Sequence, residues 1–264
     1  MTKLKLILRP DADCPDAAEV LVSGNVCGAD YTFLLDTGAA VSRIANDLHT
    51  SQFSVVSRRK RETAFSKYTD DMVILPELNF NGLVKTDFHL TRAAPGDPEA
   101  PNLLGMDFLR DYCCRFNFSA GELILEDEPL SDSPNRELTL DKCAHPFIKV
   151  NLEGNDAIAA WDTGAGLTIA GLGFLRAHAR LFQETGRIEA EDSGGATRGV
   201  RMFRMVPFHI AGAVIPEQLI VGLDLAPLNA RSEFAVDMII GYNTICRAAW
   251  VFDFPRRKWA IIQP

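Results

Sequence analysis

Short apolar runs separated by turn residues make up most of the chain, and most are too short for helices. Residues 1–10 alternate lysine with leucine, which is the two-residue period of a strand with one buried face. Similar runs predict strands at residues 31–35, 73–80, 86–90, 122–125, 157–161, 202–210, 218–221 and 258–262. Apolar residues recur with the period of a helix at residues 172–182. A short helix is also expected after each of two motifs in which a pair of aliphatic residues precedes glycine, at residues 103–105 and 239–241. The sequence therefore predicts an all-β fold with a few short helices.

This pattern occurs twice along the chain. The tetrapeptide Asp-Thr-Gly-Ala follows an apolar run at residues 36–39 and again at residues 162–165. Downstream, Leu-Leu-Gly at residues 103–105 corresponds to Ile-Ile-Gly at residues 239–241. Further on, Phe-Asn-Phe at residues 116–118 corresponds to Phe-Asp-Phe at residues 252–254. Landmarks in the same order indicate an internal repeat and two similar units.

The repeat also predicts where one unit ends and the next begins. Residues 127–134 are acidic and contain proline and serine, as expected for an exposed linker. We therefore expect an N-terminal unit at residues 1–126, a linker at 127–145 and a C-terminal unit at 146–264.

Charge and composition indicate which partners and which cellular compartment to expect. The formal net charge of −8 argues against nucleic acid as a partner, because phosphate binding needs a basic face. No apolar stretch approaches the ~20 residues of a membrane span, and the N-terminus lacks the pattern of a signal peptide, so no membrane partner is expected. Six cysteines without a Cys-x-x-Cys spacing predict reduced thiols and a cytoplasmic protein. The five histidines lack spacing typical of metal ligands, so neither a metal nor another cofactor is expected.

The two tetrapeptides carry the candidate chemistry. Ionised carboxylates at the ends of buried strands are costly, so two of them suggest a shared function. If the units pack about a twofold axis, Asp36 faces Asp162, and two close carboxylates share one proton. Such a pair can activate a water molecule and protonate a carbonyl oxygen. The expected supporting loop residues are Thr37, Gly38, Ala39, Thr163, Gly164 and Ala165.

Each copy resembles a retropepsin-like aspartic protease domain, in the apolar run into Asp-Thr-Gly-Ala and in the later aliphatic pair with glycine. The first copy is similar to bacterial members, and both are fused here as in pepsin-like enzymes. The resemblance implies two β-barrel lobes related by a pseudo-twofold axis. It implies an aspartic endopeptidase, active as a monomer on a peptide or protein substrate. The expected flap residues are Tyr68 in the first copy and Ser193, Gly194 and Gly195 in the second.

Two alternatives remain open at this point. The first is a catalytically inactive retropepsin-like module that binds peptides or other partners, because a fold does not by itself specify an activity. The second is pairing of each unit with another chain instead of its own twin.

The residue after each glycine bears on the pH of activity. Pepsin-like enzymes generally carry a hydroxyl residue there, which stabilises the charged carboxylate. Ala39 and Ala165 cannot donate such a bond. The pair should therefore hold its proton to higher pH, with activity greatest on the order of pH 5 to 6.

Overall fold

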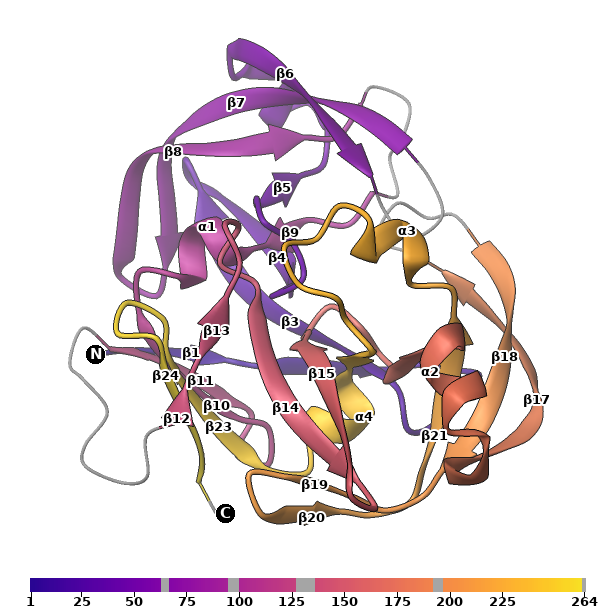
Figure 1. Ribbon diagram of the computed structural model, residues 1–264. Helices are drawn as coiled ribbons and strands as arrows, with labels where there is room; N and C mark the ends of the chain where they lie inside the picture. The colour runs from indigo at the N-terminus through magenta and orange to yellow at the C-terminus, as the bar shows by residue number, and fades with distance from the viewer. Residues whose placement is uncertain (63–66, 95–99, 127–135, 192–196, 263–264) are drawn as a thin grey trace.

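The protein is mostly β-strand in a computed structural model that describes residues 1–62, 67–94, 100–126, 136–191 and 197–262 (Figure 1). Its four described α-helices are only four to six residues long: α1 (Met106–Leu109), α2 (Leu172–Ala177), α3 (Ala226–Asn229) and α4 (Tyr242–Ile245). Two 3₁₀ turns, η1 (Thr50–Gln52) and η2 (Ala179–Leu181), complete the helical content of this part. The prediction of an all-β fold with a few short helices is confirmed.

The first half of the chain forms an eight-stranded sheet with the order β2-β3-β4-β9-β5-β8-β7-β6. Its strands are β2 (Ile7–Pro10), β3 (Ala18–Val26), β4 (Ala29–Leu35), β5 (Arg43–Ile44), β6 (Val55–Glu62), β7 (Lys67–Phe80), β8 (Leu83–Arg92) and β9 (Leu103–Leu104). The strand β4 pairs in parallel with the short strand β9, while the hairpin β6–β7 lies at the top of Figure 1.

The second half forms a ten-stranded sheet with the order β17-β18-β21-β16-β22-β15-β14-β19-β20, and β13 adds to β14. Its strands are β13 (Thr139–Leu140), β14 (Pro146–Leu152), β15 (Asn155–Trp161), β16 (Ile169–Gly171), β17 (Phe182–Glu191), β18 (Thr197–Met205), β19 (Phe208–Ile210), β20 (Ala213–Ile215), β21 (Gln218–Leu223) and β22 (Met238–Ile240). Here β15 pairs in parallel with β22, and the hairpin β17–β18 lies at the right of Figure 1.

The two sheets repeat one another in their central pairings. In the first, β5 runs antiparallel to β9 and parallel to β8; in the second, β16 runs antiparallel to β22 and parallel to β21. Leu35, at the end of β4, pairs with Leu104, and Trp161, at the end of β15, pairs with Ile240. The repeat in the sequence is therefore also a repeat in strand connectivity.

A third, six-stranded sheet takes strands from both halves, in the order β1-β11-β10-β23-β24-β12. Its strands are β1 (Thr2–Lys5), β10 (Cys113–Asn117), β11 (Glu122–Glu126), β12 (Arg136–Glu137), β23 (Ala249–Asp253) and β24 (Lys258–Ile262). At its centre β10 pairs antiparallel with β23. The Trp161 ring packs 4.8 Å from Phe116 and 4.6 Å from Phe252, centroid to centroid, so aromatic packing also joins the halves.

Three local expectations need correction. The helix predicted at residues 172–182 ends at Ala177, because His178 leaves helical geometry and Phe182 already begins β17. The strand predicted at 202–210 is divided between β18 and β19 by Pro207, which has no amide hydrogen to donate to a ladder. The predicted linker at 127–145 is described from Arg136 onward, where it contains β12 and β13.

Two further observations concern the cysteines and membrane-spanning segments. All six cysteines are free thiols, and Cys14, Cys113 and Cys114 are buried. Across the described ranges, no helix is long and apolar enough to cross a membrane.

Candidate active site

Each aspartate of the repeat lies directly after a strand whose end is held by a parallel partner. The amide of Asp36 donates to the carbonyl of Leu104 at 3.0 Å, and the amide of Asp162 donates to that of Ile240 at 2.9 Å. Both loops therefore leave their sheets at the same kind of position.

The aliphatic-glycine motifs support these loops from behind. The amide of Met106 donates to the Ala39 carbonyl at 2.8 Å, and that of Tyr242 donates to the Ala165 carbonyl at 2.7 Å. A Cβ atom on Gly105 would lie 2.6 Å from the Ala39 carbonyl oxygen, so the close approach requires glycine. The glycine in each motif is thus explained by packing against the aspartate loop.

The threonines bind the two loops to each other. The Thr37 hydroxyl donates to the Trp161 carbonyl at 2.8 Å, and the Thr163 hydroxyl donates to the Leu35 carbonyl at 2.6 Å. Each threonine amide also donates to the other hydroxyl oxygen at 3.1 Å. Both residues are buried, so these four reciprocal bonds fix the loops in register.

The carboxyl groups meet between the two glycines. The Gly38 amide donates to Asp36 Oδ1 at 2.9 Å and to Asp162 Oδ1 at 3.1 Å, and the Gly164 amide donates to Asp162 Oδ1 at 2.9 Å. A Cβ on Gly38 would lie 2.6 Å from Asp162 Oδ2, and one on Gly164 would lie 2.6 Å from Asp36 Oδ1. Each carboxyl therefore packs against the glycine of the opposite loop.

This environment favours protonation of the pair. Burial, and then the charge of Asp162, raise the pKa of Asp36 to about 8, against the opposing effects of the Gly38 amide and the Arg43 guanidinium. Burial also raises the pKa of Asp162, which the Gly164 amide and His145 counteract. The two carboxyls thus have the environment of a pair that shares one proton.

Two basic residues near the pair were not found from the sequence. Arg43 is fully buried on β5, where its Nε donates to the Pro101 carbonyl at 3.1 Å; the corresponding residue of the second copy is Ile169. His145 precedes β14, and extending the Phe147–Ala160 register by two residues brings it opposite Asp162. Neither belongs to a motif, and the pairing of β5 with β8 and β9 and of β14 with β15 brings them near the aspartates.

The expected loop residues Thr37, Gly38, Ala39, Thr163, Gly164 and Ala165 gather around the two aspartates, as the bonds above show. The flap candidates Ser193, Gly194 and Gly195 lie outside the described residues. The backbone of Tyr68 pairs with Arg61 in the hairpin β6–β7, and its side chain lies outside the described part.

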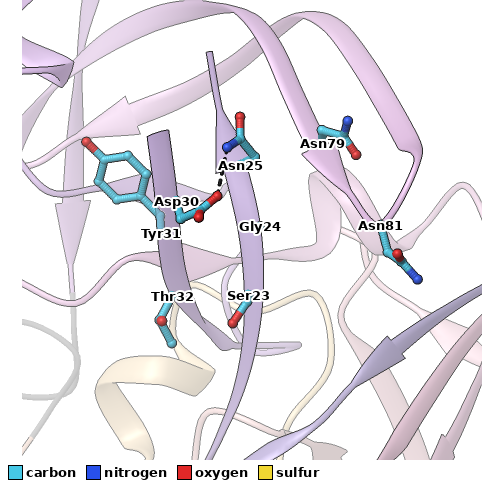
Figure 2. Close-up of a pocket in the computed structure, with 8 residues that line it drawn as sticks. All are labelled: Ser23, Gly24, Asn25, Asp30, Tyr31, Thr32, Asn79 and Asn81. Carbon is cyan, nitrogen blue, oxygen red and sulfur yellow. Dashed lines mark hydrogen bonds between the residues drawn. The ribbon is translucent and has the colours of Figure 1, made fainter. Parts of the chain in front are cut away.

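A polar groove of about 640 Å³ lies apart from the pair (Figure 2). Its lining comprises Ser23, Gly24, Asn25, Asp30, Tyr31, Thr32, Asn79 and Asn81, and includes neither aspartate loop. Figure 2 shows Asn25 bonded to Asp30, at 2.8 Å, across the β3–β4 hairpin. Asn79 accepts from the Gly82 amide at the β7–β8 turn, so several of these polar groups already serve hairpin structure.

A group of three side chains that includes His145 could hold a metal ion. Ligand atoms of Asp141, Cys143 and His145 all lie within 4.8 Å of one another, in the turn between β13 and β14. The sequence Asp-Lys-Cys-Ala-His places these three donor residues at alternate positions. The spacing of the histidines alone does not reveal this cluster, because it contains only one histidine.

No family model matches the chain, and no curated protein matches it at a significant level. Its chemistry is therefore inferred from the geometry of the site.

Proposed function

We propose that the chain is an aspartic endopeptidase built from two retropepsin-like barrel lobes, at residues 1–126 and 146–264, related by a pseudo-twofold axis. The observation that carries the proposal is the pair of carboxyls packed against opposite glycines, on two loops that reciprocal threonine bonds join. Two acids that share a proton between them can act as base and acid on one substrate.

The surroundings favour different roles for the two aspartates. Two backbone amides lower the pKa of each acid, but the charge of Asp162 raises the pKa of Asp36, whereas a hydrogen bond from the Asp36 side chain lowers that of Asp162. A hydrogen bond to a carboxylate stabilises its charged form, so in this proposal Asp162 is the ionised base and Asp36 carries the shared proton. The raised pKa of Asp36, about 8, supports this assignment.

Peptide hydrolysis then proceeds without a covalent enzyme intermediate. Asp162 takes a proton from a water molecule as its oxygen attacks the peptide carbonyl carbon, while Asp36 gives its proton to the carbonyl oxygen. The resulting gem-diol collapses when Asp162 passes its proton to the amide nitrogen and Asp36 recovers one from a diol hydroxyl. The C–N bond breaks, the amine and the acid leave, and the pair returns to its starting state.

The test is cleavage of a peptide library by the wild type and by Asp36→Asn and Asp162→Asn. Each substitution keeps the side-chain shape but removes one acid, so turnover should fall by at least ~100-fold with the circular dichroism spectrum unchanged. Asp30→Asn, in the groove of Figure 2, is the matched control and should retain wild-type turnover.

Inhibition by pepstatin should accompany the activity. Near-wild-type turnover in either aspartate variant contradicts the paired mechanism. A wild type that binds library peptides but cleaves none at any pH would favour the inactive binding module instead.

A further inference from the structure

We propose that the turn containing Asp141, Cys143 and His145 binds a single Zn²⁺ ion or a cation of similar chemistry. Its three donor side chains occupy alternate positions between β13 and β14, and their ligand atoms lie within 4.8 Å of one another. The turn adjoins the carboxyl pair through His145, which lies near Asp162, but the inference does not depend on protease activity.

The backbone of the turn is already organised around Asp141. Its Oδ1 accepts the amide of Cys143 at 2.8 Å and that of His145 at 3.0 Å. The Ala144 amide donates to the Asp141 carbonyl at 3.0 Å, which closes the turn. Because these bonds already hold the chain, metal binding needs little further ordering of the backbone.

The spacing of two donors already approaches that of a metal site. Asp141 Oδ2 and His145 Nδ1 lie within hydrogen-bond distance, 2.8 Å apart. Two ligands at zinc-to-oxygen and zinc-to-nitrogen distances of about 2.0–2.2 Å stand roughly 3.3 Å apart in a tetrahedron. A metal ion can therefore lie between these two atoms after an opening of roughly 0.5 Å, with the imidazole bound through Nδ1 and its single ring proton on Nε2.

The donor set selects the type of cation. A thiolate, an imidazole and a carboxylate together suit Zn²⁺ or Co²⁺, whereas Mg²⁺ and Ca²⁺ prefer oxygen ligands alone. The Cys143 side chain is exposed, so an ion can enter from solvent, and a water molecule can complete the tetrahedron. The thiol releases its proton on binding, so affinity should rise with pH.

Titration of the purified, metal-free chain with Co²⁺ tests the proposal. We expect one equivalent to bind, with a thiolate-to-cobalt charge-transfer band in the near ultraviolet and visible bands of four-coordinate cobalt. Zn²⁺ should bleach these bands, and excess Mg²⁺ should leave them unchanged.

Cys143→Ser should abolish the charge-transfer band, and His145→Gln should weaken cobalt binding by at least about tenfold. Cys246→Ser is the matched control, since it removes another partly accessible thiol, and it should leave the titration unchanged. Absence of a charge-transfer band in the wild type, or its survival in Cys143→Ser, would overturn the proposal. All variants are compared by circular dichroism, so loss of binding in a folded Cys143→Ser protein is distinguished from unfolding.

Discussion

At the scale of single residues, the two aspartates occupy similar loops in unequal surroundings. Arg43 lies near Asp36 and lowers its pKa, while His145 does so for Asp162, and neither has a counterpart of the same type in the other copy. A repeated sequence can therefore place two acids in different surroundings.

The first residue-scale prediction concerns the pH dependence of peptide cleavage. The pKa of Asp36 is raised to about 8, so the shared proton is held below that pH and lost as pH rises through it. The proposed mechanism needs this proton, so kcat/KM should fall on the alkaline side with a limb near pH 8, and activity should be greatest in weakly acidic solution. A pH profile of kcat/KM measures this directly.

Replacing Ala39 and Ala165 together by serine extends that test. A hydroxyl that donates to the ionised carboxylate lowers its pKa, so the acid limb should move to lower pH. An acid limb that stays in place, or a wild-type maximum near pH 2 to 3, would contradict this account of the site.

At the scale of elements, very short strands position the chemistry. β9 has two residues and β22 has three, yet each pairs in parallel with the strand that leads to an aspartate. Each is followed by a glycine and a four-residue helix whose first amide bonds the aspartate loop. Such elements have little stability by themselves, so close packing must hold them.

This packing predicts the effect of adding one methyl group. A Cβ on Gly241 would lie 2.5 Å from the Leu167 carbonyl carbon, which is backbone and cannot move aside easily. Gly241→Ala should therefore lower the free energy of unfolding by about 1–3 kcal/mol or more, measured by urea denaturation. It should also reduce turnover, because the second aspartate loop shifts.

Gly173→Ala is the control for Gly241→Ala. Gly173 lies within α2, and an added Cβ would meet no atom within 4 Å. Its replacement should leave stability unchanged or raise it by up to about 1 kcal/mol, since alanine favours helices. Equal stability of the Gly241 and Gly173 variants would show that the close approach does not constrain the loop.

At the scale of the whole molecule, the two halves share one sheet and one set of buried aromatic residues. The central pairing of β10 with β23 joins segments that are far apart in the sequence, and β1 adds the N-terminus to the same sheet (Figure 1). The reciprocal threonine bonds lie beside the carboxyl pair. Both half-sites are thus joined within one chain.

We therefore predict that the active species is a monomer. Sedimentation under assay conditions should give the mass of one chain, and kcat/KM should not change on dilution. A mixture of Asp36→Asn and Asp162→Asn proteins should remain inactive, because neither chain contains a complete pair. Recovery of activity on mixing, or its loss on dilution together with a dimer, would indicate pairing between chains.

The sequence by itself determined the class of fold, the repeat and the positions of the aspartate loops, because these depend on local periodicity and short motifs. Tertiary structure decided the rest. The segment expected to be a linker carries strands and a donor cluster, and the basic residues near the two acids come from β5 and from the turn before β14. Burial, charge and strand register act between residues far apart in the chain. They set the pKa of each carboxyl, and no local pattern of residues contains that information.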